Sequence, residues 1–391
     1  MKRILAGLLA ALMLSALPGC GQKEPEPVEP TTPVEIPAPE PSPAPLPEVI
    51  PIPEPEPAPE PDPIGDILAA MTLEEKVGQL FLARYSESAA PEDTRQLHLG
   101  GWILFAVDFE NETPDSIRAE LSALQTAAHI PLLIAVDEEG GTVTRVSRFS
   151  AFRSSKFPSP RSLYKKGGLD LVVKTEAEKA DLLSSLGINV NLAPVCDITT
   201  NPDAFMYNRS LGLSPEETGT VIAGMVQTAS DHGVAACLKH FPGYANNVDT
   251  HVGIAVDSRS LETLEANDLV PFRMGFEAGC GAVLVSHTVV ECLDDTLPAS
   301  LSPTVIGYIR NEMNFDGVIV TDDLVMQAIT DRYGAAEAAV MAVQAGCDLL
   351  CSTEYKLQYQ AVLDAVSEGR ISPETLDAAV YRILTWKQSM T

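Results

Sequence analysis

Basic residues are scarce in this chain of 391 residues, which holds 26 Lys and Arg against 54 Asp and Glu and carries a formal net charge of −28. Such an acidic chain lacks the positive surface that binds a phosphate backbone, so nucleic acid is not expected as a partner. The sequence also lacks a Gly-x-Gly-x-x-Gly fingerprint and a Walker loop. Their absence argues against a nucleotide-binding fold.

Cysteine is sparse as well, and its spacing is unlike that of a zinc site. No Cys-x-x-Cys pair occurs among the seven cysteines, and no Cys/His spacing suggests zinc. We therefore expect that activity requires no metal ion and no organic cofactor. We interpret the six cysteines outside the N-terminal region as small buried side chains, some of which an exported protein can pair as disulfides. They are Cys196, Cys237, Cys280, Cys292, Cys347 and Cys351.

The apolar run near the N-terminus is too short to span a bilayer. It covers residues 4–17, follows two basic residues and leads into Leu17-Pro18-Gly19-Cys20. Residues 1–20 therefore resemble a lipoprotein signal with Cys20 as the lipidation site. This predicts an exported protein, anchored through a lipid to the outer face of the cell membrane. The alternative is an ordinary secretory signal, in which Cys20 is incidental and the protein is released.

Residues 21–63 predict a disordered linker. They hold 17 of the 31 prolines, ten acidic residues and one lysine. Alternating proline and glutamate cannot bury a core and favours extended polyproline II. At about 3.1 Å per residue, such a linker reaches roughly 130 Å. This length suits an enzyme that is held at a membrane and works in the cell wall.

Residues 64–391 are long enough for one large domain, and eight short apolar runs recur along them. Helical patterns lie between most of these runs, at 215–231, 271–278 and 335–345 for example, and the first of these begins with the capping box of Ser214 and Glu217. Eight alternations of strand and helix predict a single α/β domain, a TIM-type (β/α)8 barrel rather than an open doubly wound sheet. The apolar runs are 77–83, 101–106, 131–137, 188–197, 234–239, 282–287, 317–322 and 347–351.

Polar residues follow five of these runs at the point where each run ends. Because the carboxyl ends of barrel strands lie on one face, these residues are expected to converge on one pocket. Lys239 and His240 end the fifth run, and Pro242 and Gly243 then turn the chain out of extended geometry. The other groups are Asp137-Glu138-Glu139, Asp197, Ser286-His287 and Thr321-Asp322-Asp323.

Asp249 and His251 lie two residues apart on the loop after the fifth run. A carboxylate at this spacing can orient an imidazole and raise its basicity. An Asp-x-His sequence by itself is equally typical of a surface loop. Its place just after Lys239-His240-Phe241-Pro242-Gly243 favours a catalytic role.

Taken together, these stretches resemble glycoside hydrolase family 3, in its single-domain β-N-acetylhexosaminidase branch. The resemblance covers nearly all of residues 64–391, and the motifs follow one another in the family's order. They are Leu73-Glu74-Glu75-Lys76-Val77-Gly78-Gln79-Leu80-Phe81, Asp137-Glu138-Glu139-Gly140-Gly141 with Arg145, Asn191-Leu192-Ala193-Pro194-Val195-Cys196-Asp197, Asn208-Arg209-Ser210-Leu211-Gly212, Lys239-His240-Phe241-Pro242-Gly243, Asp249-Thr250-His251 and Asp316-Gly317-Val318-Ile319-Val320-Thr321-Asp322-Asp323-Leu324.

The resemblance implies a retaining glycosidase and assigns roles to individual residues. It makes Asp322 the nucleophile that forms a covalent glycosyl-enzyme, and His251 the acid/base, supported by Asp249. We add His287, which ends the sixth run, as a further candidate for lining the pocket. Sugar binding is assigned to four other residues: Asp137, Arg209, Lys239 and His240.

The implied substrate is a carbohydrate with a terminal β-linked N-acetylhexosamine, and the linker points to peptidoglycan or its fragments as its source. We expect a monomer. The loop before Asp249 is one residue shorter than the commoner family pattern, which affects the expected preference for a leaving group. Two alternatives stay open. One is another family 3 exo-glycosidase such as a β-glucosidase, against which the Asp249/His251 pair argues; the other is a non-catalytic, lipid-anchored wall-binding protein.

Overall fold

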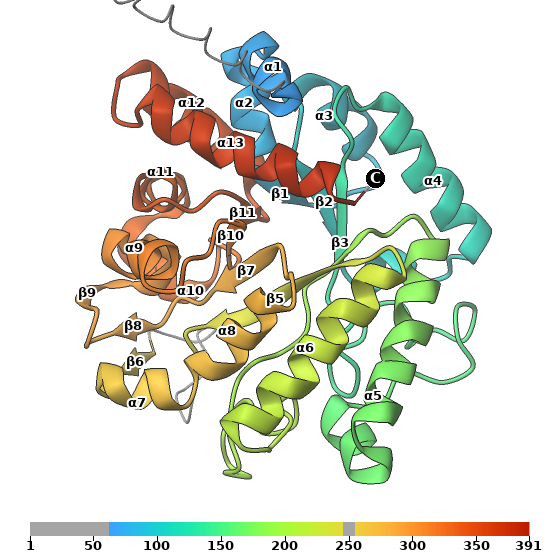
Figure 1. Cartoon of the computed structure of the whole chain (residues 1–391). Helices are drawn as coiled ribbons and strands as arrows, with labels where there is room; N and C mark the ends of the chain where they lie inside the picture. Colours follow the sequence, from blue (N-terminus) through green and yellow to red (C-terminus); the bar gives the residue numbers. More distant parts are fainter. Residues whose placement is uncertain (1–61, 245–254, 391) are drawn as a thin grey trace, which may run out of the picture. The chain divides into compact units, whose positions relative to one another are not determined.

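A computed structural model of the chain describes residues 62–244 and 255–390 (Figure 1). Four predicted features lie outside these residues: the signal, the linker up to residue 61, the lipidation site Cys20 and the pair Asp249 and His251. The last two residues assigned to the linker are described, and Pro63 is the first residue of a helix. The contacts within the chain divide it into a unit of residues 1–59 and a unit of residues 60–391. Among the described residues, no helix is long and apolar enough to cross a membrane.

Eight parallel strands form the central sheet, in the order β10-β7-β5-β4-β3-β2-β1-β11. The two end strands meet at a bridge between Val320 and Leu349, so the sheet nearly closes on itself. The prediction of an eight-stranded barrel is confirmed. The strands are β1 (Phe81–Arg84), β2 (Gly101–Leu104), β3 (Leu133–Val136), β4 (Val190–Asn191), β5 (Ala235–Phe241), β7 (Ala282–Val285), β10 (Val318–Thr321) and β11 (Leu350–Ser352).

Helices surround the central strands (Figure 1). The capping box predicted at Ser214 and Glu217 is present, and α6 and α11 have the predicted bounds. The helices are α1 (Pro63–Ala70), α2 (Leu73–Gln79), α3 (Ala90–Leu97), α4 (Pro114–Ala127), α5 (Pro160–Ser185), α6 (Pro215–Asp231), α7 (Leu261–Ala266), α8 (Leu269–Glu277), α9 (Pro303–Asn311), α10 (Gln327–Tyr333), α11 (Ala335–Ala345), α12 (Tyr355–Ser367) and α13 (Pro373–Gln388).

A second, small sheet was not predicted from the sequence. It consists of β6 (Val256–Asp257), β8 (Val289–Val290) and β9 (Asp294–Pro298), in the order β6-β8-β9. Two of its strands have only two residues each. Such short segments carry no periodic pattern, so tertiary contacts decide whether they pair.

The barrel strands are apolar because they are covered on both faces. Every residue is buried in six of them: β2, β3, β4, β7, β10 and β11. Parallel strands between a filled barrel interior and an outer layer of helices are expected to be continuously hydrophobic. Polar residues therefore gather toward the strand ends, as Lys239 and His240 do in the last three residues of β5.

The six cysteines in the described residues are free thiols. Cys196, Cys237, Cys280, Cys347 and Cys351 are buried, as expected for small core side chains, whereas Cys292 is partly exposed. Burial raises the pKa of the Cys280 thiol to about 11. The buried thiols are therefore protonated and unreactive at neutral pH.

Candidate active site

The strand ends enclose a cavity of about 940 Å³. It is lined by side chains that lie in or after β2, β3, β4, β5, β7, β10 and β11, which belong to very different parts of the chain. Five of the six described residues predicted from the sequence for the site line this cavity: Asp137, Arg209, Lys239, His240 and Asp322.

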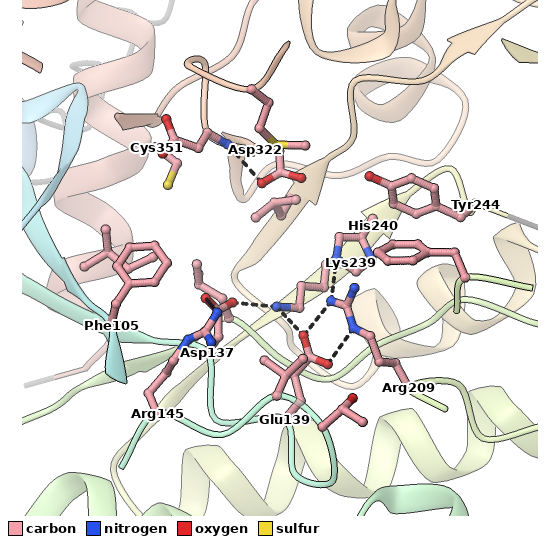
Figure 2. A pocket seen from close by; sticks show the side chains of 18 of the residues that line it. Phe105, Asp137, Glu139, Arg145, Arg209, Lys239, His240, Tyr244, Asp322 and Cys351 are labelled. Atoms are coloured by element: carbon pink, nitrogen blue, oxygen red, sulfur yellow. Dashed lines mark hydrogen bonds and ion pairs between the residues drawn. The ribbon is translucent and has the colours of Figure 1, made fainter. Parts of the chain in front are cut away.

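Lys239 is the centre of a charged cluster on one wall of the cavity (Figure 2). Its ammonium group lies 2.6 Å from Asp137 Oδ1 and 2.8 Å from Glu139 Oε1. Glu139 in turn accepts two hydrogen bonds from the Arg209 guanidinium, at 2.9 and 2.7 Å. Arg145 extends the array beyond Asp137, since its Nη2 lies 3.3 Å from Asp137 Oδ2. Positive and negative groups thus alternate from Arg145 to Arg209.

The alternating charges keep one another ionised. Burial opposes the charged form of Glu139, but Lys239 and Arg209 outweigh it and hold the pKa of Glu139 well below its usual range. Burial likewise opposes the charged form of Asp137, and Lys239 and Arg145 lower its pKa. Burial opposes the charged form of Lys239 as well, but the carboxylates of Asp137 and Glu139 raise its pKa. The cluster therefore presents fixed charged donors and acceptors, which suit the hydroxyl groups of a sugar.

His240 joins this cluster to a deeper carboxylate. Its Nδ1 lies 2.8 Å from Asp197 Oδ2, and its Nε2 lies 3.0 Å from Arg209. Because the carboxylate can only accept and the guanidinium can only donate, these partners place the ring proton on Nδ1. Asp197 also accepts the backbone N–H of Tyr244 at 2.7 Å. Burial opposes ionisation of Asp197, but His240 and Tyr244 lower its pKa.

Asp322 follows β10 directly and faces the charged cluster from the opposite side of the cavity (Figure 2). Its backbone N–H donates to the carbonyl of Val285 on β7 at 3.1 Å, so the neighbouring strand holds the position. Its Oδ1 accepts the N–H of Asp323 at 2.9 Å. The carboxylate is thereby oriented at the end of a rigid strand.

The carboxylate of the adjacent Asp323 is bound by groups of the protein itself. Its carboxylate accepts the backbone N–H of Thr353 at 3.2 Å, the hydroxyl of Thr353 at 2.5 Å and the N–H of Val325 at 3.2 Å. Burial raises the pKa of this carboxyl group, and these hydrogen bonds oppose the rise. Asp323 thus ties the strand end to the next loop and supports Asp322.

His287 does not line the cavity, contrary to the prediction. Its side chain is fully buried, with Nδ1 2.7 Å from the hydroxyl of Ser300 and Nε2 3.0 Å from the carbonyl oxygen of Asp323. Both ring nitrogens are therefore engaged by the protein. The imidazole supports the chain segment that carries Asp322, and offers no polar atom to a sugar.

The loop after β3 explains the motif Asp137-Glu138-Glu139-Gly140-Gly141. Glu138 is buried and accepts the backbone N–H groups of Arg145 and Val146, at 2.7 and 2.8 Å. Gly140 has a φ of 97°, and a Cβ atom there would lie 2.4 Å from the carbonyl oxygen of Pro158. The sharp turn thus needs glycine, and it sets Asp137 and Glu139 on the same wall.

Four contributors to the site received no role in the sequence analysis: Glu139, Arg145, Asp197 and Tyr244. Three of them stand in the quoted motifs, but a motif does not reveal which of its polar residues meet partners from other strands. The fourth, Tyr244, lines the cavity at the last described residue before the segment with Asp249 and His251.

The sequence profile of the Glycosyl hydrolase family 3 N terminal domain matches residues 72–386. This chain belongs to glycoside hydrolase family 3. A curated relative, the beta-hexosaminidase LpqI of Mycobacterium tuberculosis, is 33% identical over 334 residues, which cover 82% of this family 3 hydrolase and 84% of the relative. A beta-hexosaminidase of Neisseria gonorrhoeae is 34% identical and covers 72% of this chain and 77% of its own length.

Solved structures agree with this assignment. A family 3 beta-N-acetylglucosaminidase from a Paenibacillus species superposes with a TM-score of 0.77 and 36% identity, over 82% of this family 3 hydrolase. The match spans 63% of the Paenibacillus chain, so that protein is considerably longer. LpqI of Mycobacterium tuberculosis has a TM-score of 0.76 and 29% identity, and the match covers 83% of this chain and 96% of LpqI.

Proposed function

We propose that the protein is a retaining exo-β-N-acetylhexosaminidase that releases terminal β-linked N-acetylglucosamine. The observation that carries this proposal is the placement of one carboxylate, Asp322, opposite a cluster of sugar-binding charges across a single cavity. The names of the relatives, beta-hexosaminidase and beta-N-acetylglucosaminidase, support the identity of the sugar.

In the first step an oxygen of Asp322 attacks the anomeric carbon. The bond from that carbon to the leaving-group oxygen breaks, and His251 donates a proton to this oxygen. In the second step His251 removes a proton from water, whose oxygen attacks the same carbon and releases Asp322. Asp249 orients the His251 imidazole, and the charged cluster holds the sugar hydroxyls throughout.

The experiment that tests the proposal compares His251→Ala with the wild type on two N-acetylglucosaminides. A nitrophenyl group departs without a proton, so the variant should lose less than about tenfold in its first step on that substrate. On an unactivated disaccharide kcat/KM should fall about 100-fold, since the leaving oxygen then needs the acid. Deglycosylation also needs His251, so the nitrophenyl reaction should show a burst.

Three results would count against this function. Equal losses on both substrates without a burst would make His251 a binding residue and place the acid elsewhere. A wild-type enzyme that prefers an aryl β-glucoside to the aryl β-N-acetylglucosaminide would assign the protein to another activity of the family. An inert wild-type protein that still binds wall glycans would favour a non-catalytic role.

We also propose that Cys20 carries a lipid and that the substrate comes from peptidoglycan. The supporting feature is the proline- and glutamate-rich segment between Cys20 and the barrel. In Cys20→Ser we expect the protein to move from the membrane fraction to the soluble one while its kcat stays within about twofold, because the barrel holds all the proposed chemistry. Immunoblots of both fractions test this, and an unchanged membrane fraction would refute the anchor.

A further inference from the structure

The cavity has a charged interior and one exposed aromatic side chain. Six large hydrophobic side chains are exposed among the described residues, and of these Phe205 alone lines the cavity. Its exposed fraction is 37%, whereas the side chains of Lys239 and Glu139 are 3% and 4% exposed. Phe205 therefore lies at the open side of the cavity, and the charged cluster lies deep inside.

The protein holds the Phe205 ring in place from two sides. The Tyr244 ring meets it edge to face, with ring centroids 5.8 Å apart and an interplanar angle of 67°. The Arg209 guanidinium lies 5.7 Å from its centroid. Two turns flank the residue, since Ala204 N–H donates to Asn201 and Tyr207 N–H donates to Ala204. An exposed ring held this firmly has lost its conformational freedom before any ligand arrives.

Tyr244, which meets the Phe205 ring, is itself packed against apolar side chains. Tyr244 forms with Met206 and Val195 a hydrophobic cluster separate from the main core. Tyr244 is itself fixed, because its backbone N–H donates to Asp197 at 2.7 Å. The Phe205 ring thus meets a buried tyrosine on one hand and, through Arg209, borders the charged cluster on the other.

We propose that Phe205 forms the binding platform for the leaving group, and stacks against the apolar face of a pyranose ring or against an aryl group. This inference rests on the proposed function, which places the N-acetylhexosamine in the charged interior. A pyranose ring presents C–H bonds on one face, and these pack favourably on an aromatic ring. Phe205 lies next to Arg209, on the open side of the charged cluster. When the N-acetylhexosamine fills the interior, the leaving group therefore lies against this ring.

The test uses the full chain and three substrates that share the N-acetylglucosaminyl group: its β-azide, its nitrophenyl glycoside and the β-1,4-linked disaccharide. The azide has no ring to stack, so Phe205→Ala should change its kcat/KM by less than about twofold. The kcat/KM for the disaccharide and the nitrophenyl glycoside should each fall about tenfold, mostly through KM. Inhibition by free N-acetylglucosamine, measured in the presence of the azide, should be unaltered.

Three further variants control for the fold. Phe205→Leu keeps an apolar side chain against Tyr244 without an aromatic face, and should behave like Phe205→Ala. Phe205→Tyr keeps the face and should retain wild-type kinetics. Leu357→Ala, at a side chain on α12 that is 52% exposed and lies outside the cavity lining, should leave all three substrates unaffected.

Equal losses on all three substrates would overturn the proposal, because Phe205 would then act on the charged cluster through Arg209. Unchanged kinetics in Phe205→Ala would overturn it too. The failure of the proposed function has a different signature, since the wild type would then cleave none of the N-acetylglucosaminides. In that case the same contrast between azide and aryl glycoside is measured with the sugar that the wild type does cleave.

Discussion

Asp322→Ala should lower kcat by about 10⁴-fold or more on every substrate. Asp322 is the carboxylate opposite the charged cluster, and in the proposed mechanism no covalent bond to the anomeric carbon can form without it. The loss should not depend on the leaving group, in contrast to that of His251→Ala. Mass spectrometry of the wild type with a slowly hydrolysed fluorinated N-acetylhexosaminide should reveal a glycosyl adduct on the peptide that contains Asp322, absent from the variant.

Asp322→Asn is the control for structure, since its amide oxygen can still accept the N–H of Asp323. This variant should be equally inactive and should unfold like the wild type. Asp323→Asn should be milder, because Asp323 contacts Thr353 and Val325 and acts through the position of Asp322. An adduct that persists in Asp322→Asn, or a larger loss in Asp323→Asn, would place the nucleophile elsewhere.

Lys239→Met should reduce both stability and sugar binding. At neutral pH we expect a loss of about 3–5 kcal/mol in the free energy of unfolding, because two buried carboxylates then face each other without their shared cation. We expect kcat/KM to fall about 1,000-fold, since in the proposed function Lys239 both contacts the sugar and positions Asp137 and Glu139. Urea unfolding and steady-state kinetics at pH 7 measure the two effects.

The stability loss in Lys239→Met should depend on pH. The folded-state pKa values of Asp137 and Glu139 are lowered. Their ionised forms therefore add stability that is complete above their unfolded-state pKa values, near 4, and is lost as the pH falls through the folded-state values. Without Lys239 these carboxylates bind protons more readily. The difference between variant and wild type should thus be largest at pH 7 and shrink as the pH falls to about 4.

Two variants check that charge is the cause. The double variant Lys239→Met/Glu139→Gln removes one of the two carboxylates that have lost Lys239 and should recover part of the lost stability. Lys76→Met breaks a more exposed ion pair with Asp377 and should cost less than about 1 kcal/mol. A loss in Lys239→Met that is the same at pH 7 and pH 4 would mean that packing, and not charge, explains it.

Residues at similar places in the sequence often have different environments in the structure, and no local sequence pattern distinguishes them. Asp322 and Asp323 follow the same strand and both line the cavity, yet only the Asp323 carboxylate is bound by Thr353 of the next loop. By contrast, Lys239 and His287 both end apolar runs, and only Lys239 lines the cavity. Side chains alternate along a strand, and the partners that meet them come from other strands. Sequence patterns therefore could not predict which partners these side chains would meet.

The sequence by itself determined the barrel, because its signals are local. Runs of apolar residues specify buried strands, and Ser214 with Glu217 begins α6 through contacts only three residues apart. The order of the motifs likewise placed Asp137, Lys239 and Asp322 at strand ends. Tertiary structure alone decided that Glu139 binds both Lys239 and Arg209. Arg209 lies 70 residues after Glu139 in the sequence. Such a buried charge array forms only when distant strands bring compensating partners together, since each charge alone would be too costly to bury.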